Sequence, residues 1–230
     1  MNSRARFDPN EEVSGVEPPR KLHAVSTPHP PARLTAYFAT GAPKCVVIRR
    51  GPSRYSQMIL WHTDRDEFEL GQWIRGSVSN LTMTRDASYA ALGLMGILPR
   101  DDSDTAEQCS VVCRPPFFTA LEVLRGGLAL NHFHITPQDE LVVHGENLEI
   151  LAPNPCPLKR ISWAERGDCP LDHRYALHGE GSSGTDQQGR AILLREGCIY
   201  ALGESEPRLL LDTNPFRFEP VSPRDWATRW

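Results

Sequence analysis

The sequence lacks any apolar run close to the roughly 20 residues that a membrane-spanning helix needs. Its first residues, MNSRARFDPNEEVSG, have no apolar middle of the kind that a secretory signal carries. Basic charge is not in excess either, since the net charge is −4 and the pI is near 6.1. These absences argue against a membrane protein and provide no overall attraction to nucleic acid or anionic lipid. We therefore expect a cytoplasmic protein whose six cysteines are mostly free thiols.

The sequence also lacks the common catalytic signatures. It contains no Gly-x-Ser-x-Gly nucleophile elbow. The glycine-bearing stretch HGEGSSG at 178–184 has neither the spacing of a phosphate-binding P-loop nor that of a dinucleotide fingerprint. Acidic pairs such as Asp64 with Asp66 are typical of solvated turns. Whether the protein is an enzyme therefore stays open.

Turn-forming residues are abundant, with 17 glycines and 20 prolines. This composition favours many short strands and turns over long helices. Residues 1–32 are polar and proline-rich without periodicity, and we predict a disordered N-terminal tail there. Residues 33–230 are predicted to form a single all-β domain. The stretch FFTALEVL at 117–124 fits either a strand or a short helix, and the final FRFEPVSPRDWATRW is expected to pack on the domain through its tryptophans.

A polar turn followed by an apolar strand recurs along the chain. Three stretches share this plan: Met83–Leu94, Ile135–Gly145 and Gly184–Leu194. Their fourth turn positions are Ala87, Asp139 and Gly189, which are 52 and 50 residues apart. A supersecondary unit that recurs near 50 residues predicts a repeated β-meander.

These turns resemble the Ser-Pro-Asp-Gly-type turns of TolB-like, WD40-like β-propeller repeats. The resemblance rests on Thr84-Arg85-Asp86-Ala87, Thr136-Pro137-Gln138-Asp139 and Asp186-Gln187-Gln188-Gly189. It implies a small β-propeller-like array of about four four-stranded blades. A strand near Leu34–Ala39 would complete the last blade. If the ring does not close, a twisted β-sandwich or an open meander array is the alternative.

Other segments resemble a group of uncharacterised bacterial proteins. The similar stretches are RRGPSRY, LGQWIRG, CRPPFFTAL, LLREGCIYAL and FEPVSPRDWA. This resemblance covers much of the chain and implies no known activity.

The basic segment RRGPSRY at 49–55 is the candidate binding site. Its residues Arg49, Arg50, Arg54 and Tyr55 are predicted to lie at an exposed hairpin turn. Guanidinium groups bind phosphate or carboxylate through paired, charge-assisted hydrogen bonds, and arginine beside tyrosine is favoured at protein interfaces. A solvated hairpin turn without a ligand is the simpler alternative.

Three histidines form the candidate metal site. His132 and His134 are two residues apart and would share one face of a strand, while His144 lies across the predicted hairpin. Three imidazoles are a suitable ligand set for zinc. Buried, hydrogen-bonded histidines with no metal are the alternative.

Taken together, these patterns favour a non-enzymatic β-repeat module that binds another protein. The first alternative is a metal-assisted hydrolase that uses the three histidines and zinc. The second is nucleic-acid binding through the Arg49–Arg54 turn, where basic and aromatic residues alternate. The acidic overall charge argues against that second alternative.

Overall fold

The structure is a computed structural model that describes residues 30–51, 53–96, 108–125, 133–144, 149–150, 156–162 and 176–230. These residues form four β-sheets and one short 3-10 helix, η1 (Asp225–Thr228). The all-β class predicted from the sequence is confirmed. No helix in the described part of the chain is long and apolar enough to cross a membrane.

Each sheet is built mainly from strands that follow one another along the chain. The first sheet has the order β13-β1-β2-β3-β4 and the second has the order β11-β8-β7-β6-β5. The third sheet is β12-β10-β9 and the fourth is β14-β15-β16-β17. Apart from the parallel pair β10–β12, all neighbouring strands are antiparallel.

The strand bounds are as follows. In the first sheet they are β1 (Arg33–Phe38), β2 (Lys44–Arg50), β3 (Tyr55–His62), β4 (Glu67–Arg75) and β13 (Ala176–His178). In the second they are β5 (Ser77–Met83), β6 (Ala90–Met95), β7 (Gln108–Cys113), β8 (Ala120–Arg125) and β11 (Glu149–Ile150). In the third they are β9 (Phe133–Ile135), β10 (Leu141–Val143) and β12 (Arg160–Ser162). In the fourth they are β14 (Ser183–Thr185), β15 (Ala191–Arg195), β16 (Cys198–Ala201) and β17 (Arg208–Asp212).

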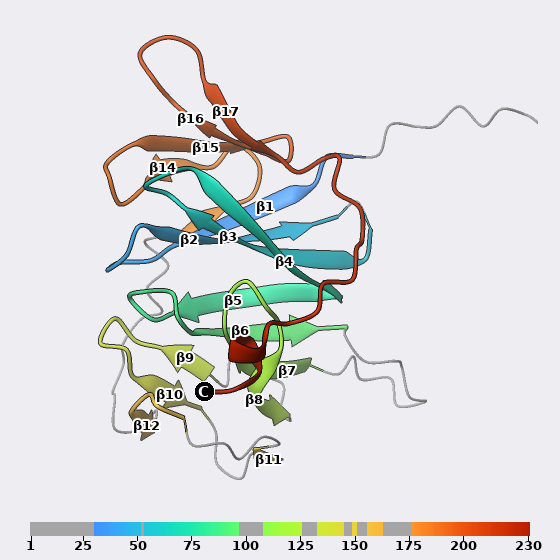
Figure 1. Ribbon diagram of the computed structural model, residues 1–230, viewed down its shortest axis with the longest axis vertical. Helices are drawn as coiled ribbons and strands as arrows, with labels where there is room; N and C mark the ends of the chain where they lie inside the picture. The colour runs from blue at the N-terminus through green and yellow to red at the C-terminus, as the bar shows by residue number, and fades with distance from the viewer. Residues whose placement is uncertain are drawn as a thin grey trace, which may run out of the picture.

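The sheets stack in the order fourth, first, second, third from top to bottom of Figure 1. Three apolar clusters fill the spaces between them. Trp61 and Ile199 belong to the cluster between the first and fourth sheets. Met58 and Leu92 join the first and second sheets, and Phe133 lies in the cluster between the second and third. Because the middle sheets are covered on both faces, their strands carry nearly continuous apolar runs.

The three repeated turns share one backbone geometry. The fourth positions Ala87, Asp139 and Gly189 all have positive φ, at 58°, 61° and 77°. The amide of each donates to the carbonyl three residues earlier, at 2.9 to 3.0 Å. This is a turn closed by a residue in the left-handed region, which favours glycine and tolerates aspartate.

A fourth turn, at 40–43 between β1 and β2, joins these three. The Gly41 amide donates to the Arg85 carbonyl at 2.8 Å, and the Arg85 amide donates to Asp139 Oδ1 at 2.7 Å. On the other side, Gln187 Nε2 donates to the Ala39 carbonyl at 2.9 Å. The four turns (40–43, 84–87, 136–139 and 186–189), hereafter the turn end, lie along the left-hand side of Figure 1.

Strand β1 belongs to the first sheet and does not complete the last one. It pairs with β2 on one side, and β13 covers its other edge, with Ala36 opposite Leu177. The expectation that this strand would complete the last blade is therefore wrong. Instead, β13, which directly precedes the fourth sheet in the chain, extends the first sheet. Closure of the four sheets into a propeller stays a prediction.

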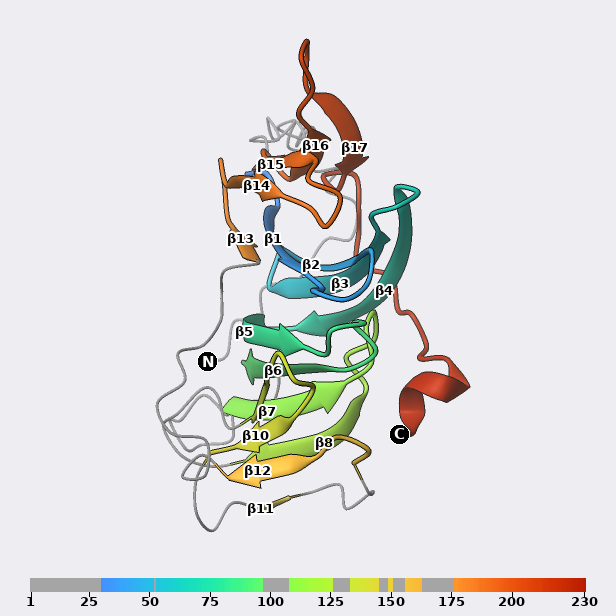
Figure 2. The ribbon, with the colours of Figure 1, turned by 90° about the vertical axis from the view of Figure 1, so that its left-hand side faces the viewer.

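The C-terminal segment 213–230, hereafter the strap, runs from the fourth sheet along one side of the first sheet to the second (Figure 2). Trp226 packs on Phe117 with ring centroids 5.5 Å apart, and Trp230 packs on Tyr89 at the same distance. The prediction that the terminal tryptophans pack on the domain is confirmed.

Two further predictions can be compared with the structure. In the ambiguous stretch 117–124, the residues from Ala120 onward belong to the strand β8 and not to a helix. Ala32 was predicted to lie in the disordered tail, but it is buried and its amide donates to Asn214 Oδ1 at 3.3 Å. The packed part therefore begins before residue 33, while residues 1–29 lie outside the described residues.

Candidate binding groove

A groove of about 520 Å³ lies at the end of the first sheet opposite to the turn end. Strands β2, β3 and β4 form one side and the strap forms the other. The lining residues are Pro30, Arg49, Gly51, Ser53, Tyr55, Trp73, Asn214, Phe216, Arg217 and Phe218. Its size falls within the range of roughly 300–1,000 Å³ that is typical of ligand sites.

Arg49 is a buried strand residue, and its predicted place in an exposed turn is wrong. It is the penultimate residue of β2 and is only 1% exposed. Its Nε donates to the Thr213 carbonyl at 3.0 Å and its Nη2 to the Phe216 carbonyl at 3.3 Å. The guanidinium also lies 5.1 Å from the centroid of the Trp73 ring. Arg49 therefore fastens the strap to the first sheet.

Burial lowers the pKa of Arg49 from its ordinary value, and the positive charge of Arg217 lowers it further. The physical cause is the loss of hydration around a charged group, combined with like-charge repulsion. Both effects destabilise an unneutralised positive charge, so an anion in this place would be favourable.

The other predicted binding residues divide between the groove and its edge. Tyr55 lines the groove and packs against Phe218, with ring centroids 4.5 Å apart and ring planes at 34°. Arg50 ends β2 and is exposed, and Arg54 is exposed in the following turn. The backbone carbonyl of Arg54 accepts a hydrogen bond from the Gly76 amide at 2.7 Å. Arg49 and Tyr55 thus lie in the groove, whereas Arg50 and Arg54 lie beside it.

Sequence reasoning missed the far wall of the groove. Trp73 comes from the end of β4, and Phe216, Arg217 and Phe218 come from the strap. One local signal was present, because Phe-Arg-Phe repeats the mixture of arginine and aromatic residues found at 49–55. No pattern within either segment, however, indicated that the two would meet.

The histidines do not form a metal site in the described part of the chain. His134 is buried in β9, where it lies opposite Val142 of β10. His144 follows β10, and His132 lies outside the described residues. Among the described residues, no three histidine, cysteine or acidic side chains are grouped closely enough to hold a metal ion. The three-histidine zinc site stays a prediction.

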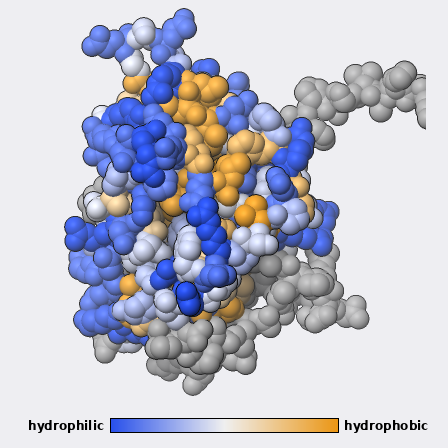
Figure 3. All heavy atoms as spheres, viewed as in Figure 1, coloured by the Kyte–Doolittle hydropathy of each residue, from blue (hydrophilic) through white to orange (hydrophobic). Residues whose placement is uncertain are grey.

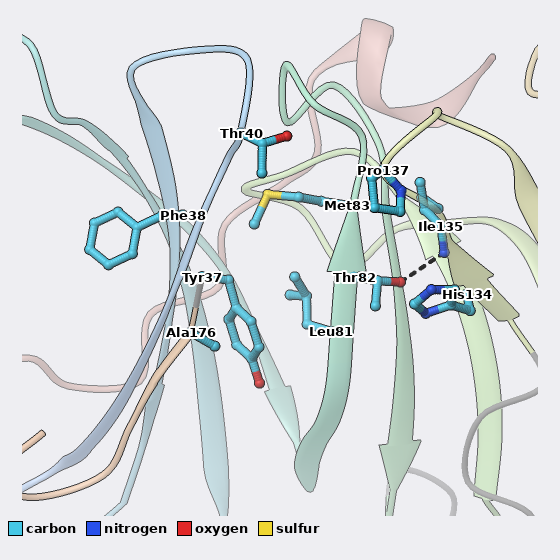
Figure 4. A pocket seen from close by; sticks show the side chains of 10 residues that line it. All are labelled: Tyr37, Phe38, Thr40, Leu81, Thr82, Met83, His134, Ile135, Pro137 and Ala176. Atoms are coloured by element: carbon cyan, nitrogen blue, oxygen red, sulfur yellow. Dashed lines mark hydrogen bonds between the residues drawn. The ribbon is translucent and has the colours of Figure 1, made fainter. Parts of the chain in front are cut away.

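His134 instead lines a small cavity between the first three sheets (Figure 4). The cavity measures about 70 Å³ and has room for on the order of five water molecules. Thr82 Oγ1 accepts a hydrogen bond from the Ile135 amide at 2.9 Å at its wall. Burial raises the pKa of Tyr37 to about 12 although a hydrogen bond to the Leu81 backbone lowers it, so this phenol is neutral. The cavity is too small for an organic substrate of ordinary size.

Glu122 on β8 forms an ion pair through a side chain that is fully buried. Its Oε2 accepts a hydrogen bond from Arg160 Nη2 at 2.7 Å. Burial raises the pKa of Glu122, and the charge of Arg160 and its hydrogen bond lower it by less. A perturbed carboxyl of this kind is a candidate general acid, but Glu122 lines neither of the two cavities.

The five described cysteines are free thiols, as predicted. Burial raises the pKa of Cys45, Cys113, Cys156 and Cys198. A raised thiol pKa suppresses the thiolate that nucleophilic catalysis needs. These four cysteines are therefore packing residues.

Comparison with known proteins adds no family to this description. No protein-family model matches the chain, and no significant match is found among curated proteins or among solved structures. Function must therefore be inferred from the molecule itself.

Proposed function

We propose that this chain is a non-enzymatic module that binds another protein through the groove and the apolar surface beside it. The observation that supports this most directly is a set of exposed large apolar side chains. Leu70 on β4 is 45% exposed, Leu209 on β17 is 51% exposed, and Phe218 on the strap is 49% exposed. Monomeric soluble proteins rarely expose large apolar patches unless these are binding sites.

These apolar residues belong to elements that share one side of the molecule. Strands β4 and β17 and the strap all face the viewer in Figure 1, and Figure 3 shows apolar side chains gathered over this part of the surface. The groove adds aromatic and arginine side chains, the residue types enriched at protein interfaces. An apolar surface next to such a groove suits a folded partner with a projecting segment.

The propeller-like interpretation of the fold belongs with this proposal. Strands β1, β5 and β9, the first strands of their units, contribute side chains to the same small cavity. First strands meet in this way around the central channel of a propeller. Interaction modules of this class present surfaces built by the loops that join their strands.

Site-specific photo-crosslinking in source-cell lysate would test the proposal. A benzophenone side chain at Leu209 is expected to give one discrete adduct with a second protein, also after nuclease treatment. The matched control is the same group at Gln138, a residue of the turn end on the other side of the first sheet, where no adduct is expected. Equal labelling at both positions, or no adduct at Leu209 and Leu70, would contradict the proposal.

Nucleic-acid binding is the second candidate, because one observation favours it. Tyr55 and Phe218 stack beside exposed arginines, and such an arrangement also holds single-stranded nucleic acid. It predicts a nuclease-sensitive adduct and affinity that falls steeply with salt. The hydrolase alternative predicts one equivalent of zinc in the purified protein, which metal analysis would measure.

A further inference from the structure

We infer that the groove receives a carboxylate that its partner carries beside an aromatic or large aliphatic side chain. This inference rests on the proposed function, since it names the chemistry of the segment that the module binds. It is carried by the charges, the unused hydrogen-bond donors and the exposed rings of the groove.

Two guanidinium groups enter the groove without an acidic partner. Arg49 uses Nε and Nη2 for strap carbonyls, which leaves Nη1 without a partner in the part of the chain described. Arg217 Nη1 donates to the carbonyls of Asn214 and Phe216, at 2.9 and 3.1 Å. Neither arginine forms an ion pair with another described residue, and none of the ten lining residues is acidic. A buried guanidinium with a free donor favours an anion, and a carboxylate matches its geometry.

The apolar half of the groove fits a ring or a branched aliphatic side chain. Phe218 leans on Tyr55 and also meets Trp73 edge-on, with ring centroids 6.1 Å apart. Because Phe218 is half exposed, one part of its surface stays open to a ligand. A further aromatic side chain would remove this surface from water and add favourable ring contacts.

A cluster of tyrosine, tryptophan and phenylalanine also suits quaternary ammonium ligands. In this groove, however, the Arg49 guanidinium already lies over Trp73. A second cation would be repelled by Arg49 and Arg217. The same rings therefore discriminate against cationic ligands and in favour of anionic ones.

The test uses the full chain and dye-labelled peptides, with binding followed by fluorescence anisotropy. The main probe carries Phe between two Glu residues and an amidated C-terminus. Two matched probes replace both Glu by Gln, or Phe by Ala. A fourth probe has no Glu but ends in Phe with a free carboxylate, which separates side-chain carboxylates from a chain terminus as the source. The Glu-Phe-Glu probe, or the free-terminus probe, is expected to bind roughly tenfold more tightly than the Gln probe.

Two variants with equal change of charge provide the control. Arg217→Gln is expected to weaken the acidic probe by roughly tenfold and to leave the Gln probe unchanged. Arg195→Gln removes an exposed arginine outside the groove and should change affinity by less than about twofold, since long-range charge is screened. Phe218→Ala should remove the advantage of the Phe probe over the Ala probe. Phe218 is exposed, so this variant is expected to fold.

The inference would be overturned if neither the Glu probe nor the free-terminus probe bound more tightly than the Gln probe, or if Arg217→Gln and Arg195→Gln caused equal losses of affinity. These outcomes can be distinguished from failure of the proposed function. If the crosslinked adduct at Leu209 is still formed but the acidic probes do not bind, the module binds protein but the groove does not bind a carboxylate. If both fail, the proposed function itself is wrong.

Discussion

At the turn end, polar side chains bond back to the protein, whereas at the groove they leave hydrogen-bonding capacity unused. Arg190 donates to both carboxylate oxygens of Asp66 at 2.8 Å and to Asp186 at 2.9 Å. Arg49, at the other end of the first sheet, reaches only backbone carbonyls and keeps one nitrogen without a described partner. Arginine is abundant at both ends, so its presence alone does not mark a site. Hydrogen-bond donors without a described partner, next to exposed aromatic rings, are a more specific indication of a binding site.

Of the changes that separate the two ends, the one with the largest expected effect breaks the ion-pair network at the turn end. Arg190→Ala would leave the buried carboxylate of Asp186 without its ion-pair partner and Asp66 with Arg208 alone, which should destabilise the protein by about 2–3 kcal/mol. Urea unfolding would measure this. The control is Arg208→Ala, because Arg208 is exposed and contacts Asp66 alone, and its loss should cost less than about 1 kcal/mol. Equal losses of unfolding free energy in Arg190→Ala and Arg208→Ala would show that the Arg190 network does not stabilise the protein as a unit.

The same network predicts a pH dependence. Burial raises the pKa of Asp66, but hydrogen bonds from Arg190 and Arg208 together lower it by more, so the pKa lies below its ordinary value of 3.8. A lowered folded-state pKa means that the stabilisation is present above the ordinary value and is lost as the pH falls through the folded pKa. Arg190→Ala should therefore lose less stability than the parent chain as the pH falls below about 4. If the free energies of unfolding of Arg190→Ala and the parent chain changed in parallel with pH, this prediction would be wrong.

At the groove end, Arg49→Met is expected to destabilise the protein by about 1–2 kcal/mol, because it removes two hydrogen bonds that join β2 to carbonyls of the strap. It should also make the strap more sensitive to limited proteolysis. Arg50→Met is the neighbouring control, since Arg50 is exposed and should contribute less than about 0.5 kcal/mol. Similar proteolysis of the two variants would indicate that Arg49 does not hold the strap.

Backbone strain should be alike at the two ends. Gly189 at the turn end and Gly51 at the groove have φ of 77° and 84°, with open space where the methyl group of an alanine would project. Alanine at either position should cost about 1 kcal/mol because φ is positive. Gly203→Ala, where φ lies outside the left-handed region and space is also open, should be nearly neutral in thermal unfolding. If Gly51→Ala were neutral, the two ends would differ in backbone strain as well as in side-chain hydrogen bonding.

A small effect on stability is expected for Phe218→Ala, at less than about 1 kcal/mol, because half of this side chain is exposed. By comparison, truncating the fully buried Trp61 should cost about 3–5 kcal/mol. Denaturant unfolding of both variants would compare them. A large loss for Phe218→Ala would mean that this ring is part of the core and not a binding surface.

The sequence predicted the turn end well because its chemistry is local. Ala87, Asp139 and Gly189 were identified by their position in four-residue turns, and all three have positive φ. The turn at 40–43 is marked in the sequence by Gly41 and Pro43, but Pro43 occupies its fourth position. Proline fixes φ near −65°, so this turn closes differently and carries no matching signature.

The groove could be predicted only in part because its chemistry is not local. Arg49 and Tyr55 were identified from their own segment, but the burial of Arg49 depends on the Thr213 carbonyl, 164 residues away in sequence. The apolar run KCVVI predicts a strand without saying which residues will cover it. Trp73 and Phe218 became groove residues through tertiary packing, which periodicity does not encode.

The pairing of β13 with β1 has a consequence for how the chain folds. Strand β1 emerges early from the ribosome, but the partner for its open edge is made only after the second and third sheets. Until then the edge of β1 can pair with other chains. Contacts so distant in sequence also slow folding, because a long loop must close before they form. We therefore expect the first sheet, although it is begun first, to be completed only after the strands of the second and third sheets have been made.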